Sequence, residues 1–567
     1  MPELIQLWST MDSVWTSPFN YTPKMKNLKI HTLILAALVT TMWTGCKELD
    51  LAPENTFTDL TYWSSEAKAQ SVLNTAYSQM FDSNRFFYNE ATSDNAYNGR
   101  GDNAGAASLA AGTYDPSLGR LQSEWNGRYT GIKTCNILLE NIDQVPDMDE
   151  AVKERMIAEA RFIRAFLHFQ LMTWFGDIPL LQKDVTIEEA QTITRAPKAE
   201  VLNFILTELE EVSRILPTQQ ELPDVERGRL TSGAAMALKA RVHLYESQWQ
   251  EVVQTTERLI SGDGFGNYAL FPSYEGLFLP ENEFNSEDIL SLQYVPQLRT
   301  WGEFFDMAPL STGARLNALA PTQELVDSYI MENGLTIDNG DSEYDEENPY
   351  ANRDPRLTAT IVYPLYDWEE NGSSRTIYIK PGTDPDPSAP DEYVPGSSST
   401  TTGYYTRKYF DPTHITQFAS GLNLMLIRYA DVLLMYAEAK NELGEMDENV
   451  WNQTIRALRE RAGFEAGSAL AFDASLNQAQ YRELIRNERR SELAMEGLRI
   501  FDIRRWKTVE DVLNGWAHGA KFGPPSEDNG YLRVNLRSFD PAKHYLWPVP
   551  RDERNLNPNL TQNPGWD

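Results

Sequence analysis

Cysteine is almost absent from this sequence, which has two in 567 residues, Cys46 and Cys135. A fold held together by disulfides needs several paired cysteines, so a disulfide framework is excluded as its source of stability. Cys135 lies in a stretch with helical periodicity and is predicted to be a small apolar core residue. Cys46 has a different context, described below.

Basic charge is also scarce. The chain has 50 Lys and Arg against 82 Asp and Glu, a formal net charge of −32. Nucleic-acid binding needs a basic stripe and attraction to anionic lipid needs a basic cluster, and the sequence has neither. We therefore exclude nucleic acid as a partner, and interpret the acidity as a well-solvated surface.

Motifs of common catalytic sites are missing as well. The sequence contains no His-Glu-x-x-His, no Gly-x-Ser-x-Gly and no phosphate-binding loop. No spacing matches a transition-metal site, so we predict no catalytic residues, no metal and no cofactor. A structural calcium stays open at one acidic run, which lacks the EF-hand order and is predicted to be a solvated turn. Its residues are Asp338, Asp341, Asp345 and Glu347.

One apolar run stands near the N-terminus, Ile30 to Val39, and it is too short to span a bilayer. Two lysines precede it, and Thr44-Gly45-Cys46 follows, which resembles a lipoprotein signal peptide with Cys46 as the lipidated residue. Trp43 departs from that pattern, where an aliphatic residue is usual. We predict that translation starts at Met25. Residues 1–24 are then a non-native extension, 25–45 the signal peptide and 46–59 a lipidated tether. The alternative is a plain secretory signal with a coincidental cysteine.

The strongest helical pattern runs from Glu159 to Leu180. Apolar residues recur on most of its circumference, which predicts a buried helix. Gly176 provides a stop signal, and Pro179 prevents the helix from resuming. Three charged residues lie among the apolar ones, where charges persist only if they are paired. They are Glu159, Arg161 and Arg164.

Helical hairpins recur along the chain. Ser232 to Ile260 reads as two helices that turn near Ser247, with small residues that allow close approach, a pattern typical of tetratricopeptide repeats. The pattern recurs at Asp431 to Gly444, followed by Val450 to Gly463. We therefore predict a mainly α fold built on paired helices.

Two stretches lack this periodicity, 84–115 and 262–424. Asn, Gly, Pro and Tyr dominate them, and loops this long are usually functional or disordered. Two short apolar runs in the second stretch are of strand length, Ile289 to Val295 and Leu357 to Val362.

Seven strings of residues resemble the SusD/RagB family of Bacteroidetes outer-membrane lipoproteins, in that family's order. They are EARFIRA from Glu159, WFGDIPL from Trp174, NRDPRL from Asn352, IRYADVLLMYAEAKNELG from Ile427, NERRSELAMEGLRIFDIRRW from Asn487, YLWPVP from Tyr545 and NPNLTQNPGW from Asn557. The acidic Lys47-Glu48-Leu49-Asp50 is similar to the surface-export signal of such lipoproteins.

The resemblance implies a scaffold of about four tetratricopeptide-like helix pairs with a large irregular loop-rich half that carries short strands. Residues 60–567 would form a single domain, with the helical scaffold mainly at 60–261 and 425–510 and the ligand-binding region mainly at 84–115 and 262–424. It implies non-catalytic capture of an oligo- or polysaccharide nutrient, passed to a SusC-like TonB-dependent transporter. The protein would be anchored in the outer membrane by Cys46, facing the cell exterior.

The charged residues in two of these strings are predicted to be structural. Because Glu488, Arg489, Arg490 and Glu492 follow one another on one helix, we expect a paired network there. The same is expected of Arg353, Asp354 and Arg356.

A sugar presents C–H faces and hydroxyl groups together, so its binding site needs exposed aromatic planes beside amide or guanidinium groups. Two irregular stretches supply both, with Trp301 the leading platform. For each aromatic, the alternative is that it fills the core of the irregular half. The predicted ligand-binding residues are Asn95, Tyr97, Asn98, Arg100, Tyr294, Arg299, Trp301, Phe305 and Trp368, with Tyr404 and Tyr405 as weaker candidates.

Three other functions stay open. A surface glycoside hydrolase needs only two carboxylates at suitable separation, which sequence does not reveal. A tetratricopeptide adaptor would bind protein in its groove. Peptide rather than glycan capture is the alternative within the same family.

Overall fold

The computed structural model describes residues 62–370, 372–386, 388 and 390–566. The chain separates into two units, residues 1–62 and 63–567, and the fold described here is that of the second. The predicted signal peptide, Cys46 and the tether lie outside the described residues.

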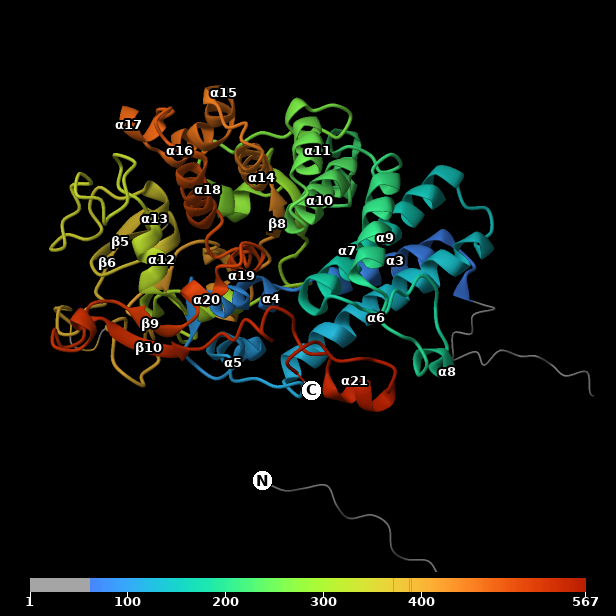
Figure 1. Cartoon of the computed structure of the whole chain (residues 1–567), viewed down its shortest axis with the longest axis horizontal. Helices are drawn as coiled ribbons and strands as arrows, with labels where there is room; N and C mark the ends of the chain where they lie inside the picture. The colour runs from blue at the N-terminus through green and yellow to red at the C-terminus, as the bar shows by residue number, and fades with distance from the viewer. Residues whose placement is uncertain (1–61, 371, 387, 389, 567) are drawn as a thin grey trace, which may run out of the picture. The chain divides into compact units, whose positions relative to one another are not determined.

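The long helices follow one another in a continuous layer, in which each packs against the next (Figure 1). Figure 1 shows this succession running from α3, α6 and α7 through α10 and α11 to α14 and α18. The bounds are α3 (Glu66–Met80), α6 (Gly119–Asn141), α7 (Glu150–Phe175), α9 (Lys198–Val212), α10 (Ser232–Tyr245), α11 (Trp249–Ser261), α14 (Tyr429–Glu442) and α18 (Gln478–Glu492).

Helix α7 is the predicted buried helix. The Asp149 side chain caps it by accepting from the backbone N–H groups of Ala151 and Val152, and Gly176 ends it at φ +73°. Its charged residues are paired as predicted. Glu159 binds Arg229, and Arg161 and Arg164 share the carboxylate of Glu208, while Arg161 also binds Glu211. The helix interior thus contains charge only where a partner neutralises it.

The predicted hairpin is also present. α10 ends at Tyr245 and α11 begins at Trp249, with Ser247 at φ +54° in the turn between them. The second hairpin begins with α14, but its other arm is interrupted. α15 (Glu448–Trp451) passes through a π-helical turn, Asn452–Arg456, into α16 (Ala457–Ala462). The paired-helix prediction is confirmed.

The irregular half holds five antiparallel strand pairs among the described residues: β1–β3, β2–β8, β4–β7, β5–β6 and β9–β10. The strands are β1 (Ala96–Asn98), β2 (Asp288–Leu292), β3 (Leu319–Pro321), β4 (Ile361–Val362), β5 (Tyr366–Glu370), β6 (Ser373–Ile377), β7 (Tyr405–Thr406), β8 (Leu424–Arg428), β9 (Gly515–Gly519) and β10 (Leu532–Arg537).

Short helices lie between the strands and between the long helices. The strand predicted at Leu357 to Val362 is wrong in its first part, because Asp354 caps a helical turn and Pro355 begins it, so only the last two residues are strand. The stretch 84–115 contains short elements where none were predicted. The short helices are α4 (Ser83–Tyr88), α5 (Ala106–Ala111), α8 (Ile187–Ala190), α12 (Gln323–Ser328), α13 (Pro355–Thr360), α17 (Gly467–Leu470), α19 (Arg499–Arg505), α20 (Val509–Val512) and α21 (Arg551–Leu556).

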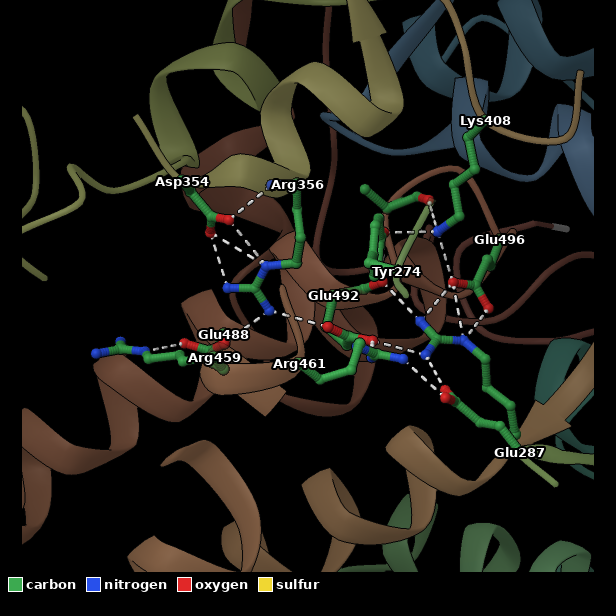
Figure 2. A network of polar contacts seen from close by, with 12 residues as sticks. Tyr274, Glu287, Asp354, Arg356, Lys408, Arg459, Arg461, Glu488, Glu492 and Glu496 are labelled. Carbon is green, nitrogen blue, oxygen red and sulfur yellow. Dashed lines mark hydrogen bonds and ion pairs between the residues drawn. The ribbon is translucent and has the colours of Figure 1, made fainter. Parts of the chain in front are cut away.

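A buried ion network joins the irregular half to the helices (Figure 2). Arg428, at the end of β8, contacts Glu287, Glu492 and Glu496 at 2.6 to 2.8 Å. Arg356, on α13, also binds Glu492, at 2.9 Å. The network is completed by Asp354, Lys408, Arg459, Arg461 and Glu488. The predicted paired network is confirmed for Asp354, Arg356, Glu488 and Glu492. Arg489 is paired outside this network, with Asp431 and Asp502, and Arg353 donates to backbone carbonyls instead of pairing with a carboxylate.

Burial alone would favour the neutral form of these carboxylates. It acts to raise the pKa of Glu492, but the charges of Arg461 and Arg428 outweigh it and hold the pKa below its usual range. Burial lowers the pKa of Lys408 to about 8, although Glu496 opposes the shift. The network therefore persists because its charges neutralise one another out of water.

Helix α18, which carries Glu488 and Glu492 of the network, also fixes the loop that leads into β1. Arg490, on α18, donates to Asn95 Oδ1 at 2.8 Å and binds Asp94 at 2.9 Å. Arg499, on α19, binds the other oxygen of Asp94 at 2.8 Å. The backbone that leads into β1 is thus attached to the helices by charge-assisted hydrogen bonds.

A histidine clamps the β9–β10 hairpin. His518 Nδ1 lies 2.7 Å from Glu324 on α12, and Nε2 lies 3.0 Å from Asp528. Arg533, on β10, donates to the same Asp528 oxygen at 2.7 Å. The hydrogen bond to Glu324 is the main cause that raises the pKa of His518, and Asp528 adds to it while partial burial opposes it.

We predict that Arg428→Ala lowers the free energy of unfolding by about 3–5 kcal/mol, because it leaves buried carboxylates without their cation. Urea unfolding measures this loss. The control is Arg456→Ala, which removes an exposed partner of Glu460 and should cost about 0–1 kcal/mol. Equal, small effects of both substitutions would contradict a supporting role for the network.

We predict that His518 stabilises the fold more in mild acid than in alkali. A folded-state pKa above the unfolded value of about 6.5 gives stability that is fully present below that pH and lost as the pH rises through the folded pKa. The melting temperature of the wild type should therefore exceed that of His518→Gln by more at about pH 6 than at about pH 9.

The matched control for this titration is His243→Gln, because burial lowers the pKa of His243. The melting temperature of the wild type should exceed that of His243→Gln by less, and not by more, as the pH falls. A pH-independent difference between wild type and His518→Gln would show that the clamp does not titrate as stated.

Candidate functional site

The first predicted stretch lies in and around β1, and most of its polar side chains are engaged within the protein. Asn95 is 1% exposed; its amide donates to Glu90 at 3.0 Å and accepts from Arg490. Asn98 is 2% exposed, and with its amide oriented to satisfy both ends it donates to the carbonyl of Ala318 and accepts from the backbone N–H of Asn103. The prediction that these two amides are free for a ligand is wrong, because they fix the loop itself.

Tyr97 and Arg100 are only partly buried. Tyr97 points to the face of β1 opposite Ala96 and Asn98, as strand alternation requires. Arg100 donates to the carbonyls of Asn317 and Ser399 at 2.8 and 2.9 Å, and so ties two other loops to this one. Of the first stretch, the Tyr97 ring is the accessible aromatic.

The aromatic residues predicted in the second stretch are buried in the core and do not form an exposed platform. Trp301 is 4% exposed, donates from Nε1 to the Leu422 carbonyl at 2.7 Å and packs on Phe87 at 4.9 Å between ring centres. Phe305 and Trp368 are fully buried, the latter beneath Arg407. The expected exposure of these rings is wrong. The irregular half lacks long amphipathic elements, so large aromatics provide its hydrophobic core.

The remaining aromatic residues predicted in the second stretch are also buried. Tyr294 is buried, and its hydroxyl accepts from the backbone N–H of Ser83 at 3.0 Å. Tyr404 and Tyr405 are also buried. Arg299 stays at the surface, with its guanidinium 4.9 Å from the centre of the Tyr294 ring. Among the residues predicted in the second stretch, Arg299 is therefore the one that stays accessible.

The structure brings the two stretches together through one backbone segment. The N–H of Gly99 donates to the carbonyl of Ala318 at 2.9 Å, and the N–H of Ala318 donates to the carbonyl of Asp306 at 2.8 Å. Asn103 donates to the hydroxyl of Tyr88 at 2.8 Å. Hydrogen bonds through the buried Ala318 thus join the loop after β1 to the loop around Asp306, and the surface of these two loops is the candidate site.

An exposed aromatic ring that sequence reasoning missed stands on this surface. Phe418 is 40% exposed and rests edge-on against the buried Phe305, at 5.4 Å between ring centres. The guanidinium of Arg315 lies 5.5 Å from the Phe418 ring and binds Asp306 at 2.7 Å. We call Phe418, Arg315 and Asp306 the Phe418 platform.

Phe418 has φ +48°, a left-handed conformation that a bulky residue adopts only where its surroundings enforce it. Its sequence neighbourhood, Thr416-Gln417-Phe418-Ala419, carries no periodicity or motif. The one available signal was membership of the irregular stretch 262–424. The platform combines a flat apolar face with a forked donor and a carboxylate acceptor, the groups that hold a sugar ring.

Burial is the main cause of the pKa shifts of the carboxyl groups in this area. Burial raises the pKa of Asp306, and Arg315 offsets part of the shift. Burial also raises the pKa of nearby Glu303. Burial raises the pKa of Glu90, beneath the first loop, to about 7. Within the described ranges, no group of three or more His, Cys, Asp or Glu side chains is placed to hold a metal ion.

A separate groove of about 540 Å³ lies on the helical half, between α6 and the C-terminal segment. Trp125 and Tyr129 line it, and Ile187 and Leu556 stand exposed beside it. None of its lining residues belongs to the predicted ligand-binding set. Across the described part of the chain, no helix combines the length and apolarity needed to cross a bilayer.

Comparison with known families gives two matches that together extend over most of the chain. The family described as "SusD family" matches residues 302–566, and the family described as "Starch-binding associating with outer membrane" matches residues 48–244. The first match includes the Phe418 platform, and the second includes β1 and helices α3 to α10.

Individual proteins of known families are also similar to this chain over most of its length. SusD-like protein P25 of Formosa agariphila is 25% identical over 94% of this chain and 98% of its own length. Among solved structures, a SusD-like carbohydrate-binding protein of Bacteroides fragilis is 29% identical, with a TM-score of 0.79 over 88% of this chain and all of that one. A laminarin-binding SusD-like protein is 25% identical, with a TM-score of 0.64 over 88% of this chain and all of that one.

The helical layer with its irregular half, the two family matches and the solved structures all agree with one assignment. The chain belongs to the SusD/RagB family.

Proposed function

We propose that the protein binds an oligo- or polysaccharide nutrient at the cell surface without cleaving it, and delivers it to a SusC-like TonB-dependent transporter in the outer membrane. The observation that carries the proposal is the Phe418 platform, an exposed ring beside an ion-paired guanidinium where two irregular loops meet. The relatives described as carbohydrate-binding and laminarin-binding support a glycan as the ligand class.

Each part of the platform has a task in this account. The Phe418 ring takes the C–H face of a sugar, which excludes water from an apolar contact. Arg315 still has donors for ring hydroxyls, because Asp306 and the Gly302 carbonyl use only part of its fork. Tyr97, Arg100 and Arg299, the accessible members of the predicted set, remain proposed ligand contacts around it.

The hydrolase alternative has one specific observation in its favour. Glu303 and Asp306 both have raised pKa values in the loop beside the platform, and a glycosidase needs a carboxyl group that stays protonated near neutral pH. The ion pair between Asp306 and Arg315 argues against such a role for Asp306, since it holds the charged form. Mass spectrometry of a glycan after long incubation separates the two functions, because binding alone leaves its size unchanged.

The proposed location rests on the N-terminal pattern. Cys46 would carry the lipid, and residues 46–59 would tether the folded unit to the outer membrane, facing the cell exterior. The family match described as associating with the outer membrane begins at residue 48, two positions after this cysteine. Two or more acyl chains on one cysteine give stable anchoring.

We predict that Phe418→Ala weakens glycan binding about fivefold, equivalent to about 1 kcal/mol, without unfolding the protein. Affinity electrophoresis against laminarin, starch and xylan identifies a polysaccharide that the wild type binds, and calorimetry then measures the loss. The control is Ile215→Ala, which removes a comparably exposed apolar side chain outside these loops. Unchanged affinity in Phe418→Ala would remove the platform from the site.

Trp301→Ala should behave differently from Phe418→Ala. Because Trp301 is buried and hydrogen-bonded, its truncation should lower the free energy of unfolding by about 3–5 kcal/mol. Thermal unfolding measures this difference. A stable Trp301→Ala protein with impaired glycan binding would restore Trp301 as a ligand platform.

We predict that Cys46→Ser releases the protein from the outer-membrane fraction, because the acylated thiol is lost. Membrane fractionation followed by immunoblotting measures the distribution. Cys135→Ser is the matched control, since Cys135 is a buried free cysteine of α6 and its loss leaves the anchor intact. Retention of Cys46→Ser in the membrane at the wild-type level would refute the anchor.

A further inference from the structure

A second exposed aromatic stands on the β9–β10 hairpin. Trp516 is 42% exposed, and its cross-strand partner Leu536 is 57% exposed. Single exposed apolar side chains are common, whereas adjoining ones on the solvent face of a hairpin begin an apolar patch of the kind found at interaction sites. The hairpin thus presents an apolar face that the described part of the chain leaves open.

The ring of Trp516 has a fixed polar neighbour. The guanidinium of Arg533 lies 5.6 Å from the centre of the Trp516 ring. Arg533 is held by Asp528, and Asp528 by His518, which is held in turn by Glu324 on α12. A chain of four side chains therefore sets the position of a forked donor over an exposed indole before any ligand arrives.

The hairpin is joined to the strand that carries Tyr97. Arg537, which pairs with Gly515 next to Trp516, donates to the carbonyls of Ser93 and Ala96 at 2.6 and 2.9 Å. The same guanidinium acts on the Tyr97 hydroxyl, where its charge opposes the rise that burial gives to the pKa of Tyr97. Arg537 thus links the strand that carries Tyr97 to the end of the hairpin that carries Trp516.

The hairpin also has a built-in bend. A register shift between Arg533 and Asn535 marks a bulge in β10, and bulges re-aim side chains and are frequent next to binding sites. Arg533 comes before this bulge and Leu536 after it, so two groups of the surface lie on either side of the bend. The bulge therefore shapes the face that carries Trp516.

We infer that Trp516 and Arg533 form a second glycan subsite, which with Tyr97 holds the distal units of an extended saccharide chain whose other end occupies the Phe418 platform. The chemistry is the same as at the platform, an aromatic plane beside an ion-paired guanidinium. This inference rests on the proposed function and assigns the ligand class as a chain of several sugar units rather than a monosaccharide.

The test compares short and long ligands. Calorimetry is performed with the polysaccharide that wild type binds in the electrophoresis panel and with its trisaccharide. Trp516→Ala should weaken polysaccharide binding about fivefold and leave trisaccharide binding unchanged, whereas Phe418→Ala should weaken both. Trp516→Phe, which keeps a flat ring, should restore most of the polysaccharide affinity.

Leu536→Ala is the control for the hairpin itself, because it removes the cross-strand partner and keeps the indole. It should bind the polysaccharide nearly as the wild type does, and thermal unfolding shows whether either variant has lost the hairpin. Equal loss in Leu536→Ala and Trp516→Ala would assign the effect to hairpin packing and overturn the subsite.

Other outcomes also decide the question. If Trp516→Ala binds the polysaccharide like wild type while Phe418→Ala is impaired, the second subsite is wrong and the proposed function stands. If Trp516→Ala keeps its glycan affinity and loses co-purification with the transporter, the face is a protein contact. If the wild type binds no polysaccharide of the panel, the proposed function fails and the subsite with it.

Discussion

The structure depends on one buried cation. Arg428 holds three carboxylates out of water, and they come from two distant parts of the chain: Glu287 precedes β2, whereas Glu492 ends α18 and Glu496 directly follows that helix. Such a network adds little stability over a well-packed apolar core, but it tolerates no missing partner. It therefore specifies one way of joining the irregular half to the helical layer. Figure 2 shows the network reaching from Glu287 to Asp354 across this junction.

Helix α18 transmits this order to the loops of the proposed binding site. Glu488 and Glu492 enter the central network, while Arg490 holds Asp94 and Asn95 ahead of β1. From β1 the order passes by backbone hydrogen bonds through Ala318 to the Phe418 platform. A loop surface with few long secondary elements can thus be rigid before a ligand binds, which reduces the entropy lost on binding. Helices provide the frame, and loops carry the function.

The sequence predicted the helical half well because helical periodicity and charge pairing are local signals. Glu159 and Arg164 stood among apolar residues, which required partners, and the structure provides Arg229 and Glu208. The irregular half gave no such signal. Without a period, nothing distinguished the buried Trp301 from the exposed Phe418. Asn95 and Asn98 have the composition of a sugar-binding loop, but the Asn95 amide pairs with the Glu90 and Arg490 side chains and the Asn98 amide satisfies backbone groups. Which amide faces the solvent is decided by tertiary contacts.

The ion network should keep the loops of the proposed binding site rigid without ligand. Hydrogen exchange of the backbone amides of Gly99, Ala318 and Thr322, whose acceptors lie across the loops, tests it most directly. The account predicts that these amides in the ligand-free protein exchange as slowly as those of the core of α7, and that Arg428→Ala accelerates them. Exchange at the rate of an unfolded chain in the free wild type, with protection only after a glycan is added, would contradict it.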